Sequence, residues 1–161
     1  MSLRTMTMTM GVGLGAAFGL LSGLVVAAIG YMLPVPMMMG SPPFFVNAAM
    51  MWNLSSPWTT GWVLHLFTSA VLGGIFGLLV TRFTSLRLGT PLKAVVLGLI
   101  AGAVIWFALF LPVEIPPMPG LFSMGDFMAE SLGYNLVFGV LLAVLISVAV
   151  MRRGKPSEPS A

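Results

Sequence analysis

The chain has 161 residues, of which 58% are hydrophobic and only 7% are charged, and its formal net charge is +3. A soluble domain carries about 25% charged residues, so this composition excludes a water-soluble globule and indicates a chain surrounded mostly by lipid. The sequence has no cysteine, which excludes disulfides and thiolate metal sites.

Long apolar segments recur along the chain, and a helix that crosses a hydrocarbon core about 30 Å thick needs about 20 such residues. The only Asp, Glu, Lys, Arg or His residues inside them are His65 and, at the start of the third, Lys93. The first segment, preceded by Arg4, loosely resembles a cleaved signal peptide, but it is longer than a usual signal core. The predicted spans are residues 11–32, 59–80, 91–111 and 131–151. The sequence therefore predicts an all-α integral membrane protein, a single domain built as a bundle of four transmembrane helices.

The basic residues all fall on one side of this four-span arrangement. They are Arg4, Arg82, Arg87, Lys93, Arg152, Arg153 and Lys155. The two loops on the other side have no Lys or Arg and carry Glu114, Asp126 and Glu130. The positive-inside rule then places both termini and the middle loop in the cytoplasm. This one-sided placement explains the positive charge without nucleic acid as a partner. The basic side chains are expected to contact the headgroups of the lipid bilayer.

The two halves of the chain look like tandem copies of one two-helix unit, residues 11–82 and 91–153, followed by a disordered tail at 154–161. The first half has Leu33-Pro34-Val35 where the second has Leu111-Pro112-Val113. Further matched pairs are Gly19 with Gly98, Gly23 with Gly102, His65 with Asn135, Ser69 with Gly139, Gly73 with Ala143, Gly77 with Ser147, and Arg82 with Arg152. Two copies with the same orientation are expected to be related by a pseudo-two-fold axis along the membrane normal.

Each predicted span carries small residues at every fourth position, which form one face of a helix. Small faces let two helix backbones approach closely in lipid. We expect packing within the chain, with contact to another subunit as the alternative. The residues predicted to pack helices are Gly11, Gly15, Gly19, Gly23, Gly73, Gly77, Gly98, Gly102, Gly139, Ala143 and Ser147.

The outer loops are expected to contain short interfacial helices. The first outer loop is hydrophobic, and Ser41-Pro42-Pro43 is typical of a helix start, so a short helix through Trp52 is predicted. A matching helix is predicted over residues 122–132, leading into the fourth span.

Three polar residues are candidates for a functional site: His65, Glu130 and Asn135. An ionisable residue within a membrane span is costly and suggests function. The alternative for His65 is a neutral imidazole hydrogen-bonded to a backbone carbonyl, a water or Glu130. We predict no cofactor. The alternatives are haem at His65 and copper at His65 with Met50 and Met51, because Met thioethers suit Cu(I).

The run Gly61-Trp62-x-x-His65, followed by Gly73 and Gly77 and preceded by a Pro- and Met-rich outer loop, resembles a group of small prokaryotic four-helix membrane proteins of unknown function. The resemblance implies a prokaryotic cell membrane and supplies no catalytic residue. Because no enzyme motif stands out, we predict a non-enzymatic accessory or structural subunit that binds other membrane subunits. The alternatives are a small homo-oligomeric transporter or channel, and a haem- or copper-binding membrane protein that uses His65.

Overall fold

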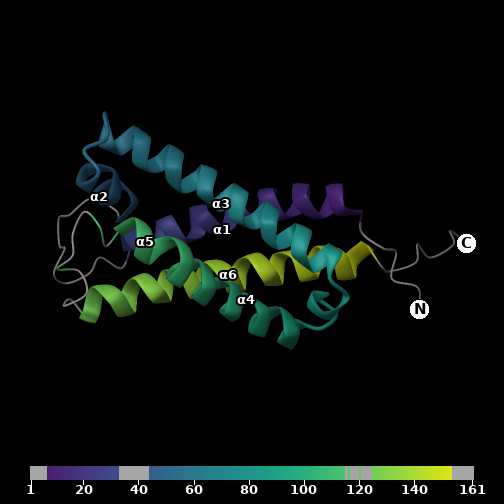
Figure 1. The fold of residues 1–161 in the computed structure, drawn as a ribbon. Coiled ribbons are helices and arrows are strands. Elements are labelled where there is room, and N and C mark those ends of the chain that lie inside the picture. The colour runs from purple at the N-terminus through teal and green to yellow at the C-terminus, as the bar shows by residue number, and fades with distance from the viewer. Residues whose placement is uncertain (1–6, 33–43, 115, 117–119, 121–124, 154–161) are drawn as a thin grey trace, which may run out of the picture.

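A computed structural model describes residues 7–32, 44–114, 116, 120 and 125–153, and in this part of the chain it is all-helical (Figure 1). Four stretches are long and apolar enough to cross a membrane. They are α1 (Met8–Met32), α3 (Pro57–Arg82), α4 with its continuation (Pro91–Val113), and α6 (Gly125–Arg153). A short helix α2 (Phe44–Met51) precedes α3, and the 3-10 turn η2 (Thr84–Leu86) connects α3 to α4. The tail at 154–161 lies outside the described residues.

Helices α1 and α3 form the first pair, and glycines bring their backbones together. A Cβ atom added to Gly15 would lie 3.0 Å from the Cα atom of Gly77 and would collide with the carbonyl group of Gly73. Gly19 and Gly11 face α3 in the same way, against Ser69 and Gly77. Glycine is required at these crossings because any side chain would push the two helices apart.

Helices α4 and α6 form the second pair, with the same kind of contact. A Cβ at Gly98 would lie 2.6 Å from the carbonyl oxygen of Gly139, and one at Gly102 would lie 2.7 Å from the Cα of Leu136. Ala94 and Ala143 are fully buried in one hydrophobic cluster further along the same pair. Both pairs thus use small residues for packing within the chain.

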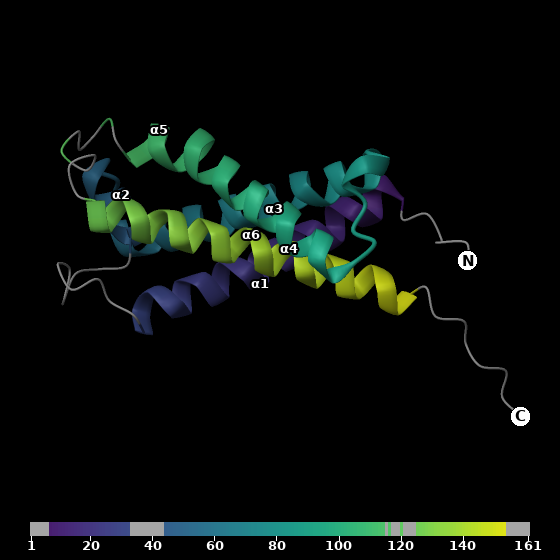
Figure 2. The same cartoon turned by 90° about the horizontal axis from the view of Figure 1, so that it is seen from below.

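The two pairs meet chiefly where α1 lies along α6. The buried cluster that joins them contains Val26 of α1 and Leu142 and Ile146 of α6. It continues to Val80 and Leu88 at the end that carries η2 (Figure 2). Helices α3 and α4 make little contact with each other in the described part of the chain, so the molecule is less tightly closed on that side.

Helix α4 runs further than the sequence predicts, through Pro112. A proline inside a helix lacks an N–H donor and clashes with the carbonyl of the residue four positions earlier. Here a π-helical turn, η3 (Trp106–Phe110), precedes the proline, and Leu111 N–H bonds to Trp106 O, five residues back. The wider turn accommodates the ring, and the helix continues as α5 (Leu111–Glu114).

The outer loops differ from each other. Helix α2 forms as predicted in the first, although residues 33–43 lie outside the described part. It ends in a Schellman motif, with Asn53 in the left-handed conformation (φ 52) and Leu54 N–H bonded to Ala49 O. In the second loop, no separate helix forms over the described residues of 122–132. These residues are the first turns of α6, which begins at Gly125 and has Asp126 in its first turn. An acidic side chain there favours the helix N-terminus.

The start of α1, the end of α6 and the turn η2 lie at one end of the molecule, and α2 and α5 lie at the other (Figures 1 and 2). We refer to these as the η2 end and the α2 end. At the η2 end, Thr7 begins α1 through a hydrogen bond from Met10 N–H to its hydroxyl, and Thr90 begins α4 through a hydrogen bond from Lys93 N–H.

Candidate functional site

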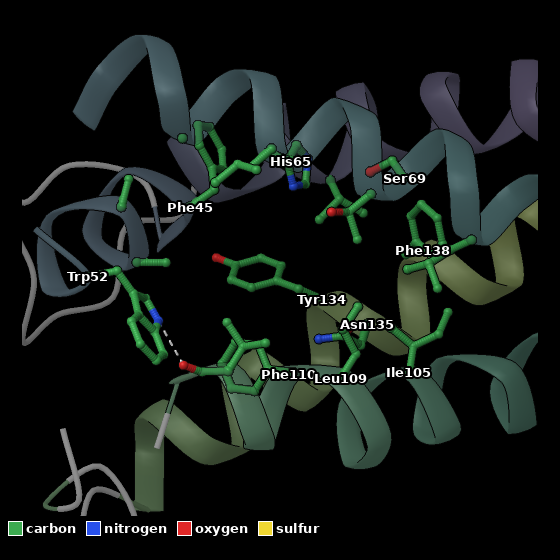
Figure 3. Close-up of a pocket in the computed structure, with 18 of the residues that line it drawn as sticks. Phe45, Trp52, His65, Ser69, Ile105, Leu109, Phe110, Tyr134, Asn135 and Phe138 are labelled. Atoms are coloured by element: carbon green, nitrogen blue, oxygen red, sulfur yellow. Dashed lines mark hydrogen bonds between the residues drawn. The ribbon is translucent and has the colours of Figure 1, made fainter. Parts of the chain in front are cut away.

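A cavity of about 300 Å³ lies between the two helix pairs, on the side where α3 and α4 separate (Figure 3). Helix α2 and the turn after it cover it at the α2 end with Phe45, Ala48, Ala49, Trp52 and Leu54. The α3 wall consists of Gly61, Leu64, His65, Thr68, Ser69 and Leu72. The opposite walls contribute Ile105, Leu109, Phe110 and Val113 from α4 to α5, and Tyr134, Asn135 and Phe138 from α6, with Val26 of α1 at the base. The site therefore draws residues from both halves of the chain.

The cavity reaches the middle of the spans. Ser69 and Phe138, both on its lining, lie near the midpoints of α3 and α6. Its surface is mostly apolar and aromatic, with a few polar groups, which is the usual character of a small-molecule site. The π-helical turn borders it with Leu109 and Phe110, and such turns are frequent at functional sites.

His65 is half-buried on the α3 wall, and its Nε2 lies 3.0 Å from the carbonyl oxygen of Gly23 on α1. A carbonyl oxygen only accepts, so Nε2 donates, and the neutral ring then has its lone pair at Nδ1. This backbone carbonyl is one of the partners expected from the sequence. The ring also stacks on Phe45, with centroids 4.7 Å apart. A metal ion at His65 would therefore have to bind Nδ1.

Phe45, which is 5% exposed, links α2 to α3 at the α2 end. It packs against Trp62, with ring centroids 4.6 Å apart, as well as against His65. The backbone of α2 crosses α3 at Gly61, where an added Cβ would lie 2.6 Å from the carbonyl oxygen of Phe45. The close crossing at Gly61 is what brings the side chains of α2 over the cavity.

Glu130 and Tyr134 form a pair on α6. The Tyr134 hydroxyl donates a hydrogen bond of 2.6 Å to Glu130 Oε1. The Tyr134 ring extends between the α3 wall and the α4 wall (Figure 3). Glu130 itself is not part of the lining, and its carboxylate contacts a lining residue through this hydrogen bond.

Asn135 lies on the wall opposite Ser69 (Figure 3). Its Nδ2 donates a hydrogen bond of 2.8 Å to the carbonyl oxygen of Ser131. The buried Ser131 hydroxyl accepts from Trp106 Nε1 at 2.9 Å, which ties η3 to α6, and donates to Met128 O. Of the three polar candidates predicted from sequence, His65 and Asn135 thus line one cavity. Glu130 does not line it but accepts a hydrogen bond from Tyr134.

The other predicted site residues lie elsewhere. Gly11, Gly15, Gly19, Gly23, Gly73, Gly77, Gly98, Gly102 and Gly139 are buried at helix crossings, and Ala143 and Ser147 are buried on α6. Met50 is 51% exposed, and neither it nor Met51 lines the cavity with His65. Among the described residues, no group of three or more His, Asp or Glu side chains is placed to hold a metal ion.

Sequence reasoning did not identify Trp52, Phe110 or Tyr134 as site residues. Aromatic residues are common near the membrane boundary, so nothing local marks Trp52 or Tyr134 as a cavity residue. Pro112 could have signalled a distorted turn near Phe110, because a proline within a long apolar run requires one. No protein-family model, curated protein or solved structure matches this chain.

Proposed function

We propose that this protein binds a small, neutral, mostly apolar molecule inside the membrane. The observation that supports it is the cavity of about 300 Å³ between the helix pairs. An engineered apolar cavity of about 150 Å³ binds benzene, so this one has room for a molecule about the size of two fused rings. Phe45, Phe110 and Phe138 offer it aromatic surface.

The proposed ligand is neutral because no Lys, Arg, Asp or Glu is among the lining residues that the structure describes. A charged group moved from water into such a site would lose several kcal/mol of solvation without a countercharge. A neutral molecule dissolved in the bilayer loses little by entering.

A role in transport is a second candidate, because the cavity occupies only the half of the molecule toward the α2 end. Toward the η2 end the helices close on a buried cluster that includes Val80, Leu88 and Ile146. A carrier whose binding site is open toward one side of the membrane and closed toward the other has this arrangement. Liposomes containing the purified protein, tested for flux of a fluorescent neutral solute, would test the transport role.

We also infer that the four spans form a bundle of two tandem two-helix units. The helix contacts support this, because matched residues make matched contacts. Gly19 faces Ser69, and their counterparts Gly98 and Gly139 face each other. Gly23 faces His65 and Ser69, and its counterpart Gly102 faces Asn135.

The proposed symmetry is incomplete in a way that favours a binding site. Helices α1 and α6 pack together, but the corresponding helices α4 and α3 make little contact in the described part of the chain. The cavity lies where this second contact would be. His65 and Asn135, which match each other in the repeat, then line one cavity from opposite halves. Sites between repeats are common in membrane transport proteins.

The accessory-subunit role, with other membrane subunits or a second copy as partner, stays a prediction, as do prokaryotic origin and haem or copper at His65. Purification from native membranes in mild detergent would test the subunit role by mass spectrometry of co-migrating proteins, and haem or copper by the absorption spectrum and metal content. Stoichiometric partners would support the subunit role.

Binding is tested by equilibrium dialysis of naphthalene against the purified protein in detergent. Ala48→Phe places a ring into the cavity from α2. Ala17→Phe makes the same change on the exposed face of α1 and controls for detergent partitioning and fold. We expect saturable binding by the natural chain and by Ala17→Phe, and at least tenfold weaker binding by Ala48→Phe. Equal binding by all three, or no saturable binding, would contradict the proposal.

A further inference from the structure

We infer that the ligand carries a hydroxyl or a similar neutral hydrogen-bonding group, and that Asn135 on α6 and Thr68 on α3 recognise it. The inference rests on the proposed binding function and names the chemical class of its ligand. Some polar groups of the cavity have hydrogen-bond partners within the protein, and others are available to a ligand.

Three of the polar side chains on the lining have partners that explain them within the protein. His65 donates to the Gly23 carbonyl, Tyr134 donates to Glu130, and Trp52 donates to the Val113 carbonyl. Each of these bonds joins structural elements or holds a carboxylate, so the fold accounts for them.

Asn135 is different. Within the described part of the chain, its carboxamide makes one hydrogen bond, from Nδ2 to the Ser131 carbonyl 2.8 Å away. A carboxamide has two N–H donors and an oxygen that accepts twice, so most of its capacity is unused there. Because it lines the cavity, a ligand can reach it.

The hydroxyls of Thr68 and Ser69 lie on the α3 wall. Neither makes a side-chain hydrogen bond to another described residue, and Ser69 is only 4% exposed. A hydroxyl in an apolar site is more stable when it has a hydrogen-bond partner, which a ligand can supply here. The Ser69 Oγ lies against Gly23 of α1. Thr68 and Asn135 line the cavity from α3 and α6, so one ligand group between them can donate to one wall and accept from the other.

Two other hydroxyls show that burial alone does not make a site. Ser22 and Ser147 are buried without a hydrogen-bond partner in the described structure, yet neither lines the cavity. Among the residues that the structure describes, unused polar groups coincide with space for a ligand only at Asn135 and Thr68. The cavity therefore favours an alcohol, phenol or ketone as its ligand over a hydrocarbon.

The test compares 1-naphthol with naphthalene, which differ by one hydroxyl, by equilibrium dialysis in the same detergent. Ala48→Phe supplies the background partitioning of each probe. We expect the natural chain to bind 1-naphthol about tenfold more tightly than naphthalene after this correction, as one or two neutral hydrogen bonds would give. Asn135→Leu and Thr68→Val should each remove most of this preference, measured within each variant as the ratio of its affinities for the two probes.

The matched controls are Thr68→Ser, which keeps the hydroxyl and should keep the preference, and Thr59→Val, which makes the same change at an exposed position of α3 outside the cavity. Equal binding of both probes by the natural chain would overturn the recognition inference and leave the binding function standing. Binding of neither probe above the Ala48→Phe background would overturn the binding function itself.

Discussion

The indole nitrogen of Trp52 donates a hydrogen bond of 2.9 Å to the carbonyl oxygen of Val113, 61 residues further along the chain. Val113 lies in the last turn of its helix, where carbonyl groups have no partner within the helix. The bond joins the end of α2, which packs on the first helix pair, to the end of α5 in the second pair (Figure 3). It therefore spans the α2 end of the cavity and holds α2 over it.

Replacing Trp52 by phenylalanine should loosen α2 without unfolding the four long helices. The change keeps an aromatic side chain and removes the donor, and one neutral hydrogen bond contributes about 1 kcal/mol. We expect amide hydrogen exchange in α2 to rise about fivefold, with exchange in α1 and α6 unchanged. Trp58→Phe, at an exposed position with no side-chain hydrogen bond to the described residues, is the control. Equal exchange of α2 in the two variants would show that the bond does not hold α2.

Gly15→Ala should weaken the packing of α1 on α3. The new Cβ would collide with the carbonyl group of Gly73, and because backbone atoms cannot rotate away, the helices must separate. Overpacking of this kind costs about 1–3 kcal/mol. The matched control is Gly13→Ala, two residues earlier on the same helix, where an added Cβ meets nothing within 4 Å. Unfolding in mixed micelles, followed by circular dichroism, should show a lower midpoint for Gly15→Ala only; similar midpoints would contradict the assigned crossing.

The spans could be predicted because length and hydrophobicity alone decide which segments can cross a membrane, and the described part of the chain has four such helices. The exact ends could not, because they depend on local hydrogen bonds. Thr7 starts α1 before the predicted Gly11, and the π-helical turn carries α4 past Pro112. Whether Thr7 starts a helix and whether a helix continues past Pro112 depend on the local backbone geometry, which composition does not determine.

The cavity was much harder to predict than the spans. His65 and Asn135 stood out because polar groups are rare within apolar helices, and both line it. Nothing in the sequence indicates that α3 and α4 separate, since this depends on how the whole pairs pack. The roles of Trp52 and Tyr134 follow from that packing, so they appear only in three dimensions.

Trp106 and Ser131 should stabilise the second helix pair jointly. Trp106 Nε1 donates to the Ser131 hydroxyl, which is buried and in turn donates to the Met128 carbonyl. A double-mutant cycle with Trp106→Phe and Ser131→Ala should give a coupling free energy of about 1 kcal/mol. Unfolding midpoints in mixed micelles measure it, and strictly additive losses would show that the bond contributes nothing to stability.

The distribution of charge predicts which end of the molecule faces the cytoplasm. Arg82, Arg87 and Lys93 lie at or beside the turn η2, whereas Asp126 and Glu130 lie in the first turns of α6, toward the α2 end. The positive-inside rule predicts that the η2 end, with both ends of the described chain, lies in the cytoplasm. The opposite end, with α2 and the mouth of the cavity, is then expected to face outward.

Because the natural sequence has no cysteine, a single introduced thiol reports this orientation without background. Ser55→Cys lies between α2 and α3 and Ser85→Cys lies in η2, and both positions are exposed. We expect a membrane-impermeant maleimide to label Ser55→Cys in intact cells or spheroplasts, and to label Ser85→Cys only after the membrane is permeabilised. The reverse pattern would invert the topology, and a ligand would then enter the cavity from the cytoplasmic leaflet. Labelling of both from outside would mean that η2 and α2 lie on the same side, which four membrane-spanning helices in this order do not allow.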